Sequence, residues 1–212
     1  MQHAADTVLA RMRRPERQAR QRAKIHELRK RIPGLAIRTT VIVGFPGETD
    51  AEFGELLEFL DEVQLERVGA FTYSPQEGTR AADMVDDVPE AVKRERLEQV
   101  QELQRQVTGE RYSALLGQRV PAIIERPGEA GRAVQARTTA QADDIDGVTW
   151  VETDAPPGTI VEVELTDVVD DYDFHGTVTR ILAPVTATRA VGRSLPVVGL
   201  GAAAAFGRPS PT

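Results

Sequence analysis

Residues 39–49 read Thr-Thr-Val-Ile-Val-Gly-Phe-Pro-Gly-Glu-Thr, and this segment limits the possible folds more than any other part of the chain. Its first half is uncharged and rich in β-branched residues, which favours a strand buried on both faces. The Gly-Phe-Pro-Gly-Glu turn then ends the strand, because glycine permits a left-handed backbone and proline stiffens the loop. Thr49 or Asp50 can cap a helix that follows. The segment therefore predicts a strand that leads through a tight loop into a helix.

The residues after this turn predict a helix over 50–63 and a second strand over 67–73. Apolar residues of the helix recur at helical spacing: Phe53, Leu56, Leu57, Leu60 and Val63. A strand–helix–strand unit implies two parallel strands. Ligands of parallel α/β sheets bind at the loops that leave the carboxyl ends of the strands. We therefore expect a binding site where the loops 44–48 and 74–79 meet.

The loop alone does not decide between a plain turn and a binding loop. It contains neither Gly-Lys-Ser/Thr nor GxGxxG, which excludes a P-loop and a dinucleotide fingerprint. Two further helices are expected over 15–31 and 89–112, and the first strand over 35–43. The first of these helices is rich in arginine. A solvated outer face and a nucleic-acid patch both fit that composition, and the solvated face is the commoner case.

Residues 113–183 have a different texture, with short β-rich runs separated by Gly, Pro and Asp turns. The runs cover 120–125, 133–137, 148–152, 160–165 and 173–181. This spacing predicts a small β-barrel. Residues 184–212 are rich in Ala, Gly and Pro, and we expect a low-complexity, disordered tail without an assigned function. The expected domains are thus 1–112, 113–183 and 184–212.

The chain has 212 residues and no cysteine, which excludes disulfides and thiolate-bound metals or clusters within it. Its three histidines lie far apart, so no metal site is expected. No Ser or Cys nucleophile motif and no placed carboxylate pair points to a catalytic residue. No apolar run approaches the roughly 20 residues that span a bilayer, and no signal peptide opens the chain. We expect a cytoplasmic location and no membrane contact.

Four motifs in the same order resemble the radical-SAM methylthiotransferase family. They are QHAAD at 2–6 with MRR at 12–14, IRTT at 37–40 with IVGFPGET at 42–49, RVGAF at 67–71, and YSPQEGT at 73–79. Within the family, the first and third motifs resemble the RimO branch, which modifies an aspartate on a small-subunit ribosomal protein. The tRNA-modifying MiaB branch differs at both places. Pieces of residues 146–173 also resemble the TRAM domain that follows the radical-SAM domain in this family.

The resemblance implies a fold of the α/β plus β class. Residues 1–112 would be the C-terminal part of a radical-SAM partial (β/α) barrel, followed by a small TRAM-like β-barrel. The family uses S-adenosylmethionine and [4Fe-4S] clusters held by cysteines, including a CxxxCxxC loop that this sequence lacks. We therefore expect a C-terminal fragment that is inactive alone and depends on a missing N-terminal polypeptide. A stand-alone TRAM-type binding module for RNA or ribosomal protein, or a MiaB-like fragment, remains the alternative.

The same resemblance suggests residues near S-adenosylmethionine. Ile42 and Gly44 would make packing or backbone contacts to the cofactor, and Gln2, Thr40 and Tyr73 would form the cavity wall. Glu48 would accept a hydrogen bond or shape the loop. An equally good reading is that Glu48 only places a negative charge at the first turn of the following helix.

The predicted β-barrel is acidic. Residues 113–183 contain five arginines, no lysine and thirteen Asp or Glu residues, a formal net charge of −8. Nucleic-acid binding draws much of its free energy from cations that meet phosphates, so this charge disfavours RNA. It favours a basic protein partner, such as a small-subunit ribosomal protein. The alternative is that the acidic residues only keep the surface soluble.

Overall fold

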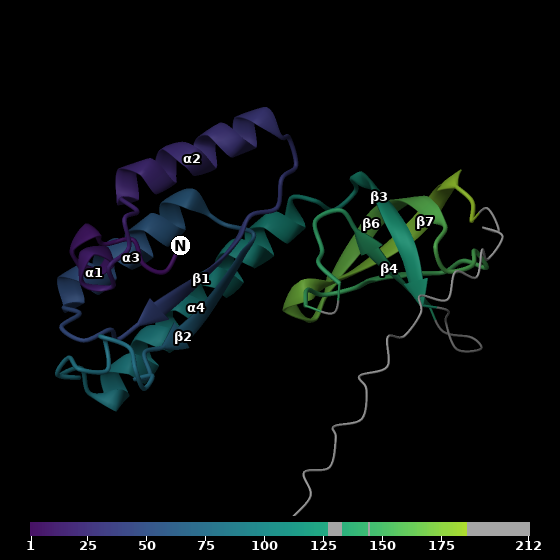
Figure 1. Ribbon diagram of the computed structural model, residues 1–212. Helices are drawn as coiled ribbons and strands as arrows, with labels where there is room; N and C mark the ends of the chain where they lie inside the picture. Colours follow the sequence, from purple (N-terminus) through teal and green to yellow (C-terminus); the bar gives the residue numbers. More distant parts are fainter. Residues whose placement is uncertain (127–132, 144, 186–212) are drawn as a thin grey trace, which may run out of the picture.

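The computed structural model describes residues 1–126, 133–143 and 145–185, which form an α/β part and a β-barrel (Figure 1). The elements of the α/β part are α1 (Asp6–Arg11), α2 (Gln18–Arg31), β1 (Arg38–Val43), α3 (Asp50–Val63), β2 (Arg67–Thr72) and α4 (Glu90–Ser113). The last of these helices runs along the sheet and ends where the barrel begins. None of the helices in the described ranges is both long and apolar enough to cross a membrane.

The strand–helix–strand unit predicted from the sequence is confirmed. β1 and β2 pair in parallel, with Ile42 opposite Phe71. Helix α3 covers the expected residues, and Thr49 caps it in a capping box with Glu52. Helix α2 begins three residues later than expected, at Gln18, because a carboxylate oxygen of Asp6 accepts the Gln18 N–H at 2.8 Å. Because Asp6 belongs to α1, this cap cannot be recognised from the residues next to the start of α2.

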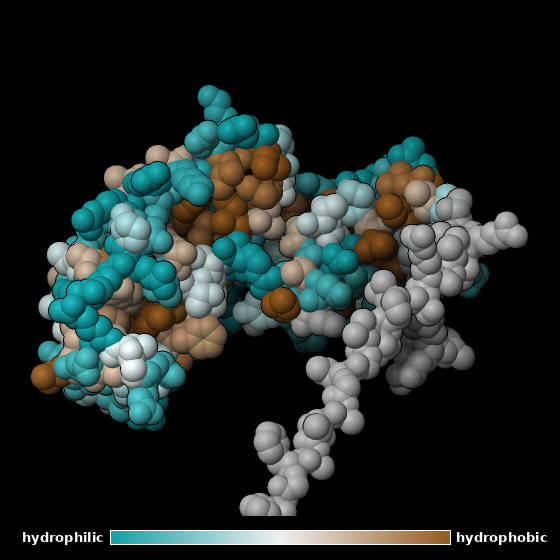
Figure 2. All heavy atoms as spheres, in the orientation of Figure 1, coloured by the Kyte–Doolittle hydropathy of each residue, from teal (hydrophilic) through white to brown (hydrophobic). Residues whose placement is uncertain are grey.

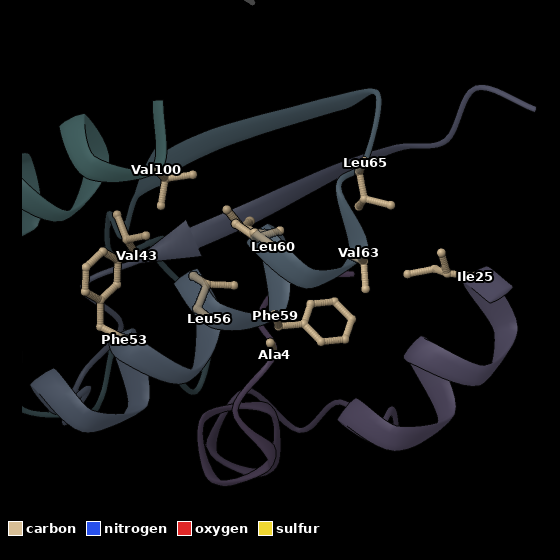
Figure 3. Packing of buried hydrophobic residues seen from close by; sticks show 11 residues of the cluster. Ala4, Ile25, Val43, Phe53, Leu56, Phe59, Leu60, Val63, Leu65 and Val100 are labelled. Atoms are coloured by element: carbon tan, nitrogen blue, oxygen red, sulfur yellow. The ribbon is translucent and has the colours of Figure 1, made fainter. Parts of the chain in front are cut away.

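One face of the two-stranded sheet packs into the main core (Figure 3). Val41 and Val43 point to this face and are fully buried. They pack with the apolar side of α3, including Leu56 and Leu60, and with Val100 of α4. Helix α2 contributes only Ile25 to the buried set, and Figure 2 shows hydrophilic side chains along much of its outer surface.

The expectation that both faces of β1 are buried is wrong. Thr40 is exposed, Ile42 is only partly buried, and Phe71 of β2 is 62% exposed. All three side chains alternate with the core positions and therefore share the second face of the sheet. The helices of the described chain pack on the first face, so this second face of the sheet remains open.

The predicted β-barrel is confirmed as a closed five-stranded barrel. Its strands are β3 (Arg119–Arg126), β4 (Val134–Thr138), β5 (Thr149–Val151), β6 (Ile160–Val169) and β7 (Asp173–Ala183), in the order β3-β4-β5-β7-β6. Strand β6 extends beyond the expected end at residue 165 because Val168 and Val169 pair with the start of β7. The turn at 127–131 and the expected disordered end, from residue 186 onward, lie outside the described residues.

A buried carboxylate joins the barrel to the amino ends of β1 and β2, opposite the carboxyl ends of the strands. Asp146, whose side chain is 4% exposed, pairs with Arg38 at 3.1 Å and with Arg67 at 3.2 Å. The Arg67 guanidinium also lies 5.1 Å from the ring centroid of Tyr112, at the end of α4. Tyr112 in turn stacks on Phe174 inside the barrel at 4.3 Å. Arg67 thus contributes to the contacts between the two parts, together with Arg38 and Tyr112.

Replacing Arg67 by methionine is expected to uncouple the two parts. It leaves Asp146 with one partner and removes the cation from the Tyr112 and Tyr172 rings, at a cost of about 2 kcal/mol. Urea unfolding followed by the single tryptophan, Trp150 in the barrel, should then separate from helix unfolding followed by circular dichroism. The matched control is Arg119→Met, which removes an exposed ion pair with Glu164 inside the barrel. Coincident curves at the unaltered midpoint for Arg67→Met would contradict this role.

Candidate cofactor and substrate cavity

A cavity of about 940 Å³ opens on the uncovered face, at the carboxyl ends of β1 and β2. Its floor is apolar or aromatic and comes from three segments: Ile42 in β1, Phe45 in the following loop, and Phe71 and Tyr73 at the end of β2. Gln2 lies beside β1, where its carbonyl oxygen accepts the Ile42 N–H at 2.9 Å. The place of the cavity is the one that the parallel strands predicted.

The Gly-Phe-Pro-Gly-Glu loop shapes one wall of this cavity. Gly44 has φ +70°, and a Cβ atom there would lie 2.3 Å from Cγ of Lys93. Both the left-handed backbone and this close approach therefore require glycine. The loop closes through the Glu48 N–H, which donates to the Phe45 carbonyl oxygen at 2.8 Å. This turn directs the Phe45 ring onto Tyr73, edge to face, with centroids 5.2 Å apart.

A buried ion pair fastens the loop to α4. Glu48 is 4% exposed, and its carboxylate accepts the Phe45 N–H at 3.1 Å and a guanidinium N–H of Arg96 at 3.1 Å. Arg96 also donates to the Glu48 carbonyl oxygen and to Asp50. Burial raises the pKa of Glu48, while the Phe45 N–H and Arg96 oppose that rise. The Phe45 N–H and Arg96 thus offset part of the cost of burying this carboxylate.

His3 lies fully buried on the other side of this carboxylate. Its Nδ1 accepts the Ala5 N–H at 3.0 Å, so the neutral ring carries its proton on Nε2. Nε2 has no hydrogen-bond partner and lies 3.8 Å from Oε2 of Glu48. Burial lowers the pKa of His3 to about 4, with Arg11 and Arg96 adding to this and Glu52 opposing it. The residue next to Gln2 is therefore a neutral imidazole at physiological pH.

This buried histidine predicts a loss of stability in mild acid. The unfolded chain binds a proton at His3 near pH 6.5, whereas the folded chain does so only near pH 4. Stability from His3 is therefore complete above pH 6.5 and declines as the pH falls toward 4, by up to about 3 kcal/mol. His3→Asn keeps an acceptor for Ala5 but cannot titrate, so its unfolding free energy should fall less over this range. Parallel pH profiles for the two proteins would refute the assignment.

Four of the six residues expected near the cofactor line the cavity: Gln2, Thr40, Ile42 and Tyr73. Gly44 and Glu48 do not line it. Gly44 faces Lys93, and Glu48 is turned toward Arg96, where it shapes the loop. Whether any of these residues contacts a cofactor stays a prediction.

The sequence reading missed Lys93 and Arg96, which hold the loop from α4. Both side chains are buried, at 1% and 5% exposure, although the residues are charged. In the structure they belong to a buried stripe with positions 100, 104 and 107 at helical spacing, but no local sequence pattern marked these two charged residues as buried. Among the apolar residues of this helix, Val100 and Val107 belong to the buried stripe, whereas Val92, Leu97 and Leu103 are only partly buried.

The structure defines a class: a parallel α/β unit with a cavity at its strand ends, joined to a small closed β-barrel. The family model described as "TRAM domain" matches residues 116–179, which make up most of that barrel.

Over 84% of its length the chain is similar to the ribosomal protein uS12 methylthiotransferase RimO of Anaeromyxobacter sp. (strain K), with 44% identity over 180 residues. The RimO proteins of Mannheimia succiniciproducens and Salmonella paratyphi B are each 43% identical, over 181 and 178 residues. The resemblance to RimO-like methylthiotransferases with a C-terminal TRAM domain is thereby confirmed. The chain spans 38% to 40% of the length of these relatives.

Proposed function

We propose that this chain is the C-terminal portion of a RimO-like methylthiotransferase, which methylthiolates an aspartate of a small-subunit ribosomal protein. The observation that carries the proposal is the open sheet face, where a parallel pair of strands ends at a cavity of about 940 Å³ without cover from the described chain. An open face with Ile42 and Phe71 on it requires further protein to complete a radical-SAM type partial barrel.

The iron–sulfur clusters of such an enzyme do not fit the residues of this chain. The sequence has no cysteine, and the described ranges contain no group of three or more His, Asp or Glu residues that could hold a metal. The cluster ligands must therefore lie outside these 212 residues. We derive no step of the reaction through a cluster from this chain.

S-adenosylmethionine does fit the cavity. The cavity combines an aromatic floor with Tyr73, whose buried hydroxyl has no hydrogen-bond partner among the described residues. Burial and the nearby Asp86 carboxylate raise the pKa of Tyr73, so the hydroxyl stays a neutral donor. Gln2, Thr40, Ile42 and Tyr73 would hold the cofactor, which supplies the radical chemistry when bound. The Glu48–Arg96 pair would keep the Phe45 wall in place, and the floor would exclude water.

The acidic barrel would dock the target. Its formal charge of −8 over residues 113–183 favours a basic protein over RNA. The RimO relatives are named for ribosomal protein uS12, and we extend that target to this chain as part of the proposal. A cytoplasmic location belongs to the same proposal. A MiaB-like activity on tRNA is the weaker reading, because the barrel would repel phosphates.

The test supplies what this chain lacks. The part of the Anaeromyxobacter relative that lies outside its matched region is purified together with this chain, and cluster-reconstituted material is assayed on uS12. Mass spectrometry should find a methylthio group on the ribosomal protein with both polypeptides and none with either alone. Ile42→Glu, which places a charge on the cavity floor, should abolish the product. Ile32→Glu, at the exposed end of α2, should not.

The proposal fails if this chain alone cleaves S-adenosylmethionine. It also fails if the pair is inactive while the whole relative modifies uS12 under the same conditions. The TRAM match and the acidic barrel support a second function, a stand-alone module that binds a ribosomal protein or RNA. Tight binding of uS12 by the chain together with an inactive pair would favour that module.

A further inference from the structure

The charges that line the cavity all have one sign. Its wall includes four arginines, at positions 11, 13, 14 and 80, and no aspartate or glutamate. The whole chain carries more acidic than basic residues, with a net charge of −7. A purely cationic wall in an acidic protein is therefore a local feature of this cavity, and it favours an anionic ligand.

Only one of these arginines is neutralised by an acid. Arg11 makes a two-point ion pair with Glu52, at 2.8 and 2.7 Å. Arg14 donates to the uncharged side-chain oxygen of Gln2 at 2.8 Å. The side chains of Arg13 and Arg80 are exposed and make no hydrogen bond or ion pair with the described residues. Three guanidinium charges thus remain available at the cavity.

The backbone at Arg13 supports a role for that side chain. The residue has φ +56°, in the left-handed region that disfavours side chains. It follows the end of α1, where the Arg14 N–H donates to the Leu9 carbonyl and the Arg13 N–H to the Ala10 carbonyl. This is a Schellman helix end, and its left-handed position is usually glycine. An arginine at this position lowers stability, and a function of its side chain at the cavity would account for that cost.

A second polar group in the cavity is also without a partner. Tyr73 lines the cavity and is only 9% exposed. Its hydroxyl makes no hydrogen bond in the described structure. A buried donor of this kind gains from an acceptor on a ligand.

We infer that Arg13, Arg14 and Arg80 bind a carboxylate of the substrate protein at the cavity. The inference rests on the proposed function, whose target side chain is an aspartate. A carboxylate suits forked guanidinium donors, and the apolar floor suits the peptide and nucleoside parts of the ligands. The amino-acid end of S-adenosylmethionine carries the same chemical group, so the experiment must separate the two sources.

The experiment measures binding to the intact 212-residue chain by calorimetry at low salt. The substrate probe is the blocked peptide Ac-Ala-Ala-Asp-Ala-Ala-NH2, and its partner has Asn in place of Asp. We expect the Asp peptide to bind about tenfold more tightly than the Asn peptide, because only its carboxylate accepts charge-assisted hydrogen bonds from the arginines. The cofactor probes are S-adenosylhomocysteine and 5′-methylthioadenosine, which lacks the carboxylate.

Arg13→Gly is the decisive variant. It should remove most of the preference for Asp while its melting temperature stays equal or rises, because glycine relieves the left-handed backbone. Arg80→Gln should weaken the preference too. Arg20→Gln removes the same charge from the exposed side of α2 and should leave the preference intact.

Equal binding of the two peptides overturns the inference, and so does an equal loss in Arg20→Gln, which would indicate only a long-range charge effect. Equal peptides with a preference for S-adenosylhomocysteine over methylthioadenosine would assign the arginines to the cofactor and also overturn it. If neither nucleoside binds, the proposed function fails, and a retained Asp preference would still support the carboxylate site.

Discussion

Replacing Gly44 by alanine is expected to lower the free energy of unfolding by about 3 kcal/mol or more. The left-handed backbone accounts for about 1–2 kcal/mol of this loss. The rest comes from a Cβ atom placed 2.3 Å from Cγ of Lys93. Lys93 cannot move aside at little cost, because its ammonium group is bound by Asp86 at 2.6 Å and by Glu90 at 2.8 Å.

Gly34→Ala is the matched control for this prediction. Gly34 has nearly the same backbone, with φ +74°, but nothing lies within 4 Å of an added Cβ atom. It should lose only the backbone contribution, and chemical denaturation of both variants measures the difference. Gly44→Ala should also weaken nucleoside binding, because Phe45 follows Gly44 directly and packs on Tyr73 at the cavity. Equal losses in both variants would show that the contact with Lys93 is not limiting.

Replacing Arg96 by methionine is expected to cost about 3–5 kcal/mol, because it leaves the Glu48 carboxylate buried without its cation. The defect should depend on pH. Burial already raises the pKa of Glu48, and removing Arg96 raises it further, so the folded variant binds this proton more readily than the unfolded chain. The penalty is therefore full at high pH and shrinks as the pH falls and Glu48 becomes neutral.

The control for this prediction is Arg22→Met, which removes a partly exposed ion pair between α2 and Glu62 of α3. Surface pairs of this kind contribute at most about 1 kcal/mol, and a small loss without pH dependence is expected. Denaturation of Arg96→Met, Arg22→Met and the parent protein between pH 5 and 8 provides the comparison. Because Arg96 also lowers the pKa of His3, the comparison is made in a His3→Asn background, where residue 3 cannot titrate. A defect of Arg96→Met that is constant over this range would contradict the buried-charge account.

Apart from α1, the elements of the α/β part could be predicted from the sequence because local patterns decide them. Helix α3 begins and ends where its cap and apolar spacing placed it, and the parallel pairing of β1 and β2 followed from their order. The strands of the barrel followed in the same way from turn residues and β-rich runs. By contrast, α2 starts at Gln18 because of Asp6, a cap from another helix that no local pattern shows.

The site was predicted less completely than the fold. The three residues proposed for the cavity wall line the cavity, and so does Ile42, which was proposed as a cofactor contact. The groups that hold the loop, Lys93 and Arg96, were missed because charged residues are normally placed at the surface. Both are buried here because acids from other segments meet them: Asp86 for Lys93, and Glu48 for Arg96. Such pairings join residues up to 48 positions apart and leave no local pattern.

The order of most strands and helices and the Gly-Phe-Pro-Gly-Glu turn could be predicted from the sequence alone, and so could the acidic barrel and the absence of thiol ligands. Each of these depends on neighbouring residues or on composition. The tertiary structure was needed to show that arginines without acids line the cavity on the open face of the sheet. It also decided that a buried carboxylate joins the barrel to the sheet. These features depend on contacts between side chains that are far apart in the sequence. Burial strengthens such contacts, and local sequence patterns do not show them.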